Sequence, residues 1–179
     1  MADLLSLARD LSNEDEGPGD LPVERWHPEH CGSMDLVIRS DGTWVHEGEP
    51  ILRASLVRLF SRVLRRDDDG YVLVTPAEKL SIQVEDVPFL AVDFERTSDG
   101  IAFRTNVGDV VTADAAHPIE MRASEAAGTS VPYIRVRGAL DARLARPAYY
   151  RLVDEAREAP DGTLSIESGG QRFALGRPV

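Results

Sequence analysis

The sequence is poor in several features that would define a function class at once. Its 179 residues include one cysteine, Cys31, and one lysine, Lys79. A single cysteine excludes an intramolecular disulfide framework. No apolar run approaches the roughly 18 residues of a transmembrane helix, and no basic cluster precedes the leucines near the N-terminus, as it would in a secretory signal. We therefore expect a cytoplasmic protein without a membrane span.

The common catalytic and nucleotide-binding signatures are also missing. The chain has no Gly-x-x-x-x-Gly-Lys-Ser/Thr, Gly-x-Gly-x-x-Gly, His-Glu-x-x-His or Gly-x-Ser-x-Gly motif. These motifs mark phosphate loops, dinucleotide sites, zinc proteases and serine hydrolases. Their absence favours a non-catalytic protein. An enzyme without a common signature stays an alternative, with Cys31, His46 or Glu78 as acid, base or nucleophile.

Positive charge is scarce and unevenly distributed. Lys plus Arg number 20 and Asp plus Glu number 31, a formal net charge of −11. Nucleic-acid binding needs clustered positive charge, so we expect no extended nucleic-acid partner. The first 20 residues hold six acids and one arginine, a net charge of −5. We interpret residues 1–21 as a short helix on an acidic linker, which serves either as a solubilising tail or as a docking element; the helix is predicted from the spacing of Leu4, Leu5, Ala8 and Leu11.

The remaining pattern predicts an α+β fold of mainly antiparallel sheets. Alternating apolar residues on both sides of Asp41–Gly42 predict a hairpin, and apolar residues at helical spacing predict a helix from Arg53 through Leu64. Consecutive short strands with tight turns follow, which favours antiparallel sheets over parallel units. The small polar residues 124–130 predict a loop, and residues 133–137 predict a strand.

A hairpin–helix–hairpin order occurs twice in the pattern. A second helix is predicted near Pro147, with a last hairpin turning at Gly169–Gly170. This helix presents Tyr149, Leu152, Val153 and Ala156 on one face. We predict an α+β half at residues 22–86 and a second at residues 87–179.

One segment is dense in residues with metal-binding or nucleophilic chemistry. Residues 26–31 contain His27, His30 and Cys31, which are possible ligands of a transition metal. A structural zinc site brings a second ligand pair, and none follows here. A single cysteine is also more often a small buried residue than a nucleophile. We therefore expect no metal and no cofactor.

Arginines gather on the first predicted helix. Five lie between residues 53 and 66 with no acid among them: Arg53, Arg58, Arg62, Arg65 and Arg66. They would suit an acidic partner or a phosphate group, or form a solvated face neutralised by Asp67–Asp69. A protein-interaction adaptor, docking through this helix or through the acidic N-terminal segment, is therefore the second functional hypothesis.

Two groups of polar residues lie at predicted turns and strand ends. His46 with the pairs Glu78–Lys79 and Glu85–Asp86 would hold a phosphate or carboxylate, or form a structural ion-pair network. Tyr133, Arg135 and Arg137 share one strand face, with arginines for anions and tyrosine for stacking, or with simple solvent exposure as the alternative.

Three segments resemble a bacterial family known as domain of unknown function 1285: residues 24–32, 41–48 and 73–79. The similarity runs from about Pro22 to the C-terminus. The resemblance implies a duplicated α+β core, a second half superficially like a pleckstrin-homology domain, a ligand site between the halves for a nucleotide-like molecule, and a role in signal transduction. It does not identify the residues of that site.

The first hypothesis is thus a non-catalytic sensing protein that binds a small anionic, nucleotide-like molecule between its halves. Its candidate ligand-binding residues, chosen from the chemistry of their side chains, are Trp44, His46, Glu78, Lys79, Tyr133, Arg135 and Arg137. No catalytic residue is assigned in this hypothesis.

Overall fold

The computed structural model describes residues 21–125 and 128–177. The helix and acidic linker expected in residues 1–21 lie almost entirely outside the described residues. The chain divides into two compact units, which are described separately. Unit 1 comprises the residues up to Arg39 together with Thr43–Glu85, and unit 2 comprises Ser40–Gly42 and the residues from Asp86 onward.

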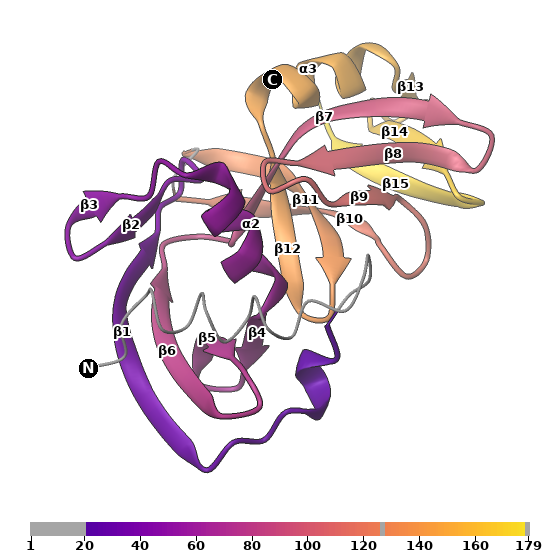
Figure 1. Ribbon diagram of the computed structural model, residues 1–179. Coiled ribbons are helices and arrows are strands. Elements are labelled where there is room, and N and C mark those ends of the chain that lie inside the picture. The colour runs from indigo at the N-terminus through magenta and orange to yellow at the C-terminus, as the bar shows by residue number, and fades with distance from the viewer. Residues whose placement is uncertain (1–20, 126–127, 178–179) are drawn as a thin grey trace. The chain divides into compact units, whose positions relative to one another are not determined.

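Unit 1 is a six-stranded sheet with one helix (Figure 1). A 3-10 turn, η1 (Val23–Arg25), precedes the sheet. The sheet has the strand order β3-β2-β1-β6-β5-β4, in which β1 and β6 are parallel and every other pair is antiparallel. Its elements are β1 (His30–Ile38), β2 (Trp44–His46), β3 (Glu49–Pro50), α2 (Ala54–Arg62), β4 (Leu64–Asp67), β5 (Gly70–Val74) and β6 (Glu78–Val84).

Unit 2 contains a second six-stranded sheet, of order β10-β11-β12-β7-β8-β9, in which β12 and β7 are the parallel pair. Its strands are β7 (Phe89–Thr97), β8 (Gly100–Thr105), β9 (Val110–Thr112), β10 (Ile119–Ser124), β11 (Thr129–Arg137) and β12 (Leu140–Leu144). Helix α3 (Arg146–Asp154) follows and packs against β7 (Figure 1). A three-stranded antiparallel sheet ends the unit, with β13 (Arg157–Glu158), β14 (Leu164–Ser168) and β15 (Gln171–Gly176).

The two large sheets have the same topology. Each consists of two three-stranded antiparallel meanders, and the first strand of one meander pairs in parallel with the last strand of the other at the centre of the sheet. The duplicated α+β architecture with mainly antiparallel sheets is therefore confirmed. The helices differ in position, because α2 separates the two meanders of unit 1 whereas α3 follows the second meander of unit 2.

Two of the predicted elements were wrong in extent. Helix α2 ends at Arg62, and Leu64–Asp67 pairs with β5 as a strand, so Arg65 and Arg66 do not lie on the helix. Val63 and Leu64 are both buried, and an apolar pair of this kind fits either a helical or a strand pattern. The loop expected at residues 124–130 is shorter, because Ser124 and Thr129 already pair across the β10–β11 hairpin.

A tight junction fixes the β14–β15 hairpin within unit 2. The Ser168 hydroxyl, which is buried, donates to the Ala113 carbonyl at 2.6 Å and accepts the Ile101 N–H at 2.8 Å. Gly169 begins the turn with φ +54°, and a β-carbon there would lie 2.6 Å from the Ala113 carbonyl oxygen. Gly170 has φ +72°, but the space around its missing side chain is open.

These neighbouring glycines provide a matched test of the junction. Alanine at either position meets the left-handed backbone penalty of about 1–2 kcal/mol. Gly169→Ala should lower the free energy of unfolding by about 1–3 kcal/mol more than Gly170→Ala, because it also overpacks the contact with Ala113. Urea denaturation of the two variants measures the difference, and equal losses would contradict the close approach.

Candidate functional site

The seven predicted ligand-binding residues divide between the two units. Trp44, His46, Glu78 and Lys79 belong to unit 1, whereas Tyr133, Arg135 and Arg137 belong to unit 2. Each group is therefore described within its own unit.

Strand β2 carries Trp44 and His46. Trp44 is 1% exposed, so its ring offers no open face for stacking in this structure. Its buried Nε1 has no hydrogen-bond partner among the described residues. The Nδ1 of His46 lies 2.8 Å from the Asp35 carbonyl oxygen, which can only accept, so Nδ1 carries the proton. Only Nε2 of this imidazole is left for another partner.

Lys79 belongs to an ion-pair network that joins β4 to β6. Its Nζ donates to Asp67 Oδ2 at 3.1 Å, and Arg65 binds the same carboxylate through Nε and Nη2 at 2.6 and 3.0 Å. Arg65 is buried and also donates through Nη1 to the carbonyls of Val23 and Trp26. The network therefore holds the segment around η1 against the sheet, which is a structural role for Lys79.

The N-terminal ends of β1 and β6 bring together part of the segment 26–31, which contains possible metal ligands. Cys31 pairs with Lys79 across the parallel β1–β6 ladder, and His30 Nε2 lies 4.0 Å from Glu78 Oε2. Cys31 and His30 are exposed. Within residues 21–125 and 128–177, no group of three or more His, Cys, Asp and Glu side chains is arranged to hold a metal ion.

In unit 2, arginines gather on one face of strands β10, β11 and β12. Tyr133 lies directly opposite Arg143, and Arg135 lies directly opposite Asp141, so all four side chains share that face. Arg122 of β10 is on the same side, opposite Val131. We call this group the arginine face; its members are Asp86, Arg122, Tyr133, Arg135, Asp141 and Arg143.

Asp141 is the centre of the arginine face. Its Oδ2 accepts from Arg122 Nη2 at 2.8 Å, and its Oδ1 accepts from Arg135 Nε at 2.6 Å. Asp141 is 6% exposed, whereas both arginine side chains are 40% exposed. A buried carboxylate thus positions two guanidinium groups whose outer sides reach solvent.

Asp86 organises the inner part of the face. The Tyr133 hydroxyl donates to its carboxylate, lying 3.0 and 3.1 Å from the two oxygens, and Arg143 Nε lies 3.1 Å from Oδ2. Burial raises the pKa of Tyr133, so this hydroxyl stays protonated at neutral pH. The guanidinium of Arg122 lies 4.1 Å from the centre of the Tyr133 ring. Arg122 therefore covers one face of the Tyr133 ring, and a ligand could not stack on that face.

Arg137 lies apart from this network. A bulge interrupts the β11–β12 pairing after Arg135. Arg137 Nη1 donates to Asp109 Oδ2 at 2.5 Å, and its guanidinium lies 5.1 Å from the Phe89 ring centre. The sequence predicted that Tyr133, Arg135 and Arg137 share one face. The structure places Tyr133 and Arg135 in one cluster and Arg137 in another.

Three arginines and two aspartates form the ion pairs of the arginine face. Glu120 of β10, which is exposed and directly opposite Tyr133, lies on the same side of the sheet, so the formal charges of this side balance. The buried Nε of Arg122 has no hydrogen-bond partner among the residues that the structure describes. Sequence reasoning missed Arg122, Asp141 and Arg143. The sequence showed which residues of each strand share a face, but it did not show that β10, β11 and β12 lie side by side.

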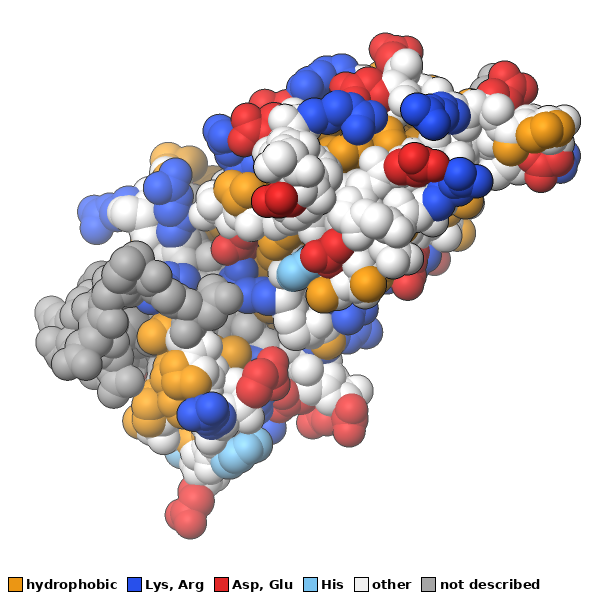
Figure 2. Space-filling model, turned by 90° about the vertical axis from the view of Figure 1, so that its right-hand side faces the viewer, with side chains coloured by type: hydrophobic (Ala, Val, Ile, Leu, Met, Phe, Trp, Pro, Cys, Tyr) orange, Lys and Arg blue, Asp and Glu red, His pale blue; other side chains and the backbone are white. Residues whose placement is uncertain are grey.

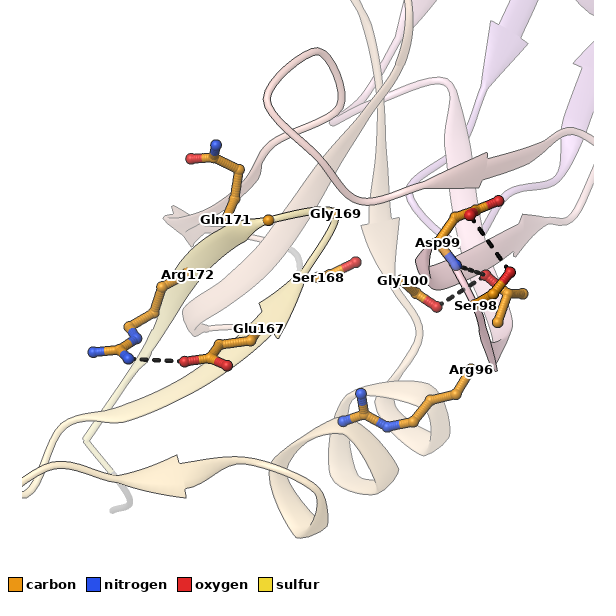
Figure 3. A pocket seen from close by; sticks show the side chains of 11 residues that line it. Arg96, Ser98, Asp99, Gly100, Glu167, Ser168, Gly169, Gln171 and Arg172 are labelled. Carbon is orange, nitrogen blue, oxygen red and sulfur yellow. Dashed lines mark hydrogen bonds and ion pairs between the residues drawn. The ribbon is translucent and has the colours of Figure 1, made fainter.

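A hollow of unit 2 lies elsewhere, between the β7–β8 turn and the β14–β15 turn. It has a volume of about 700 Å³ and is lined by charged residues of both signs. Figure 3 shows Glu167 and Arg172 joined on one hairpin, at 2.8 Å, with Arg96 on the other side of the hollow. Arg96 also binds Glu155 at 2.5 Å. Each of these two arginines is thus paired with a partly exposed carboxylate of its own.

The wider surface has no single dominant charge in the view of Figure 2, where acidic and basic side chains are interspersed. On the part of this face where side chains are described, the basic ones form no continuous track of the kind that binds extended nucleic acid. Among the described residues, neither helix has the length and apolar character needed to cross a bilayer.

The network around Lys79 makes a testable contribution to stability. Arg65 and Lys79 hold the pKa of Asp67 below its ordinary value of 3.8. This contribution is therefore complete above the ordinary pKa and is lost as the pH falls through the lowered pKa. Asp67→Asn should reduce the free energy of unfolding near pH 7 by about 1–3 kcal/mol, and the difference from wild type should disappear in strong acid.

Urea denaturation across this pH range measures the effect. Asp68→Asn is the matched control, because Asp68 is exposed in the adjacent turn. A loss for Asp67→Asn that is no larger than the control, or that does not change with pH, would contradict the role of the network.

Comparison with known proteins identifies the family. The N-terminal domain of DUF1285, a domain of unknown function, matches residues 21–87, and its C-terminal domain matches residues 88–175. A crystal structure of a DUF1285 family protein from Silicibacter pomeroyi DSS-3 is 40% identical, with a TM-score of 0.88, covering 99% of this chain and 96% of that one. A second, from Shewanella baltica OS155, is 31% identical, with a TM-score of 0.57, covering 68% and 92%. No curated protein matches the chain significantly. The chain belongs to the DUF1285 family, whose function is unknown.

Proposed function

We propose that the protein is a non-catalytic binding protein for a small anionic molecule, and that the arginine face of unit 2 is its binding site. The observation that carries this proposal is the arrangement around Asp141. Two partly exposed guanidinium groups bind one buried carboxylate, and a third arginine, Arg143, lies on the same sheet face and pairs with Asp86.

The hydrogen-bonding capacity of these arginines supports the proposal. Each guanidinium has five N–H donors, and the bond to Asp141 occupies one donor of Arg122 and one of Arg135. Arg135 uses one more on the Gly138 carbonyl. Phosphate and carboxylate groups match the paired donors of a guanidinium.

The chemistry of the face favours binding over catalysis. Its two carboxylates are engaged by arginines and by the Tyr133 hydroxyl, and the raised pKa of Tyr133 keeps that hydroxyl protonated at neutral pH. The defined face contains neither histidine nor cysteine, the usual partners in nucleophilic catalysis. A sensing role in signal transduction would require only binding.

A nucleotide is the anion that this proposal favours, following the resemblance described above. Trp44, His46, Glu78, Lys79 and Arg137 stay predictions from the sequence alone, and the proposed site in unit 2 does not use them. The pleckstrin-homology-like form of residues 87–179 likewise stays a prediction. The proposal itself depends only on Arg122 and Arg135 with the residues that position them.

Binding of inorganic pyrophosphate, ATP and adenosine, measured by isothermal titration calorimetry, tests the proposal. Pyrophosphate and ATP should bind, and adenosine should not, because the anionic group provides the contacts. Arg122→Gln and Arg135→Gln should each weaken binding about tenfold, the loss expected for a charge-assisted contact worth about 1.4 kcal/mol.

Arg172→Gln is the control, because Arg172 pairs with Glu167 on an exposed hairpin of the same unit. Circular dichroism of each variant checks that the fold is retained. The proposal is wrong if neither pyrophosphate nor ATP binds at millimolar concentration, or if folded Arg122→Gln and Arg135→Gln proteins bind as tightly as wild type.

A further inference from the structure

Helix α2 carries an apolar patch that its own unit leaves partly uncovered. Leu52 is 89% exposed, and Leu56 and Leu59 are partly exposed. Leu52 immediately precedes the N-cap residue Arg53, a position from which an apolar side chain often packs onto the fourth residue of the helix. Its high exposure shows that it does not do so here. We call Leu52, Leu56 and Leu59 the leucine patch.

The surroundings of the leucine patch are basic. Arg53 and Arg58 are exposed, and the sequence from residue 51 to residue 66 contains no acid. A matching partner would therefore present apolar side chains beside acidic ones. Exposed aliphatic side chains grouped in this way are typical of an interaction surface.

The first 20 residues of the same chain have this composition. Leu4, Leu7 and Leu11 follow the i, i+3, i+7 spacing of a single helical face. The acids within residues 1–12 are Asp3 and Asp10, and the other four acids of the first 20 residues lie in the tether that follows. If this segment binds α2, its leucines would contact the leucine patch and its acidic side chains would lie beside Arg53 and Arg58.

Residues 13–22 connect the N-terminal leucines to a segment that is held beside β4, close in the sequence to α2. Arg65 fixes the carbonyls of Val23 and Trp26, and its strand begins two residues after α2 ends. Residues 13–20 can extend about 25–30 Å, whereas the nine residues of α2 span about 14 Å. The tether is therefore longer than the helix that it has to follow. A short tether also gives an effective concentration in the millimolar range, about what a small apolar contact needs.

We propose that residues 1–12 bind the leucine patch of α2 within the same chain, through Leu4, Leu7 and Leu11, with acidic side chains beside Arg53 and Arg58. The contact covers apolar surface that would otherwise face water. It also assigns the acidic N-terminal segment an intramolecular partner, so that an external partner of α2 would have to displace it.

Paramagnetic relaxation in the full-length protein tests the proposal. A nitroxide is attached at Ser55→Cys, on the exposed side of α2, in a Cys31→Ser background. Wild-type residues 4–11 should lose their amide NMR signals while the nitroxide is active and regain them when it is reduced. Leu4→Ser/Leu7→Ser/Leu11→Ser should abolish this loss of signal. The matched control Leu5→Ser should retain it, because on a helix Leu5 lies about 100° from Leu4 and nearly opposite Leu7.

A mixed sample distinguishes a second copy as the occupant. Spin-labelled chains without ¹⁵N are combined with unlabelled ¹⁵N chains, so that only contacts between molecules cause broadening. The proposal is overturned if broadening of residues 4–11 occurs in this sample, if it is absent from the singly labelled protein, or if it persists in the triple serine variant.

Discussion

The contact of Asp141 with Arg122 and Arg135 is the interaction on which the proposed site depends. A buried carboxylate is costly unless its oxygens are fully hydrogen-bonded, and here each oxygen accepts from a different arginine. In return, the carboxylate keeps two like-charged groups close together. Removing it would leave the guanidinium groups to repel each other, so their shared orientation is a property of Asp141 rather than of either arginine.

That contact in turn depends on strand register. Arg135 and Asp141 meet because they are directly opposite on β11 and β12, and Arg122 reaches the same carboxylate from β10. A shift of one residue in either pairing would move its side chains to the other face. The apolar residues on that other face, such as Ile134 and Ala142, are buried and oppose such a shift. Core packing therefore sets the geometry of the polar face.

The duplicated topology is used differently in the two units. In unit 1, the strand that pairs in parallel with β1 carries Lys79, whose network with Asp67 and Arg65 holds the chain around η1. In unit 2, the corresponding strand β12 carries Asp141 and Arg143, which organise the arginine face. One sheet topology thus supports a structural ion-pair network in one unit and a candidate binding surface in the other.

Features that depend on residues close together in the sequence were predicted correctly. Alternation correctly placed Tyr133 and Arg135 on one face, and the hairpin turns at Asp41–Gly42 and Gly169–Gly170 are confirmed. The second helix is confirmed as well, although it ends at Asp154.

The sequence did not show which strands lie next to each other in the sheets. Asp141 and Arg122 are 19 residues apart, and Lys79 finds Asp67 12 residues away, so neither pair follows from local pattern. Trp44 was chosen for stacking, but the three-residue strand that carries it is covered by the core of unit 1. Burial at this level depends on tertiary packing rather than on the residues beside it.

The central claim is that a small anion binds to the guanidinium groups positioned by Asp141. The most direct measurement is an NMR titration of the arginine side-chain Nε–H resonances with inorganic pyrophosphate. The account predicts saturable shifts for Arg122 and Arg135 and none for Arg172. Shifts confined to exposed arginines such as Arg172, or no saturable shift at all, would contradict it.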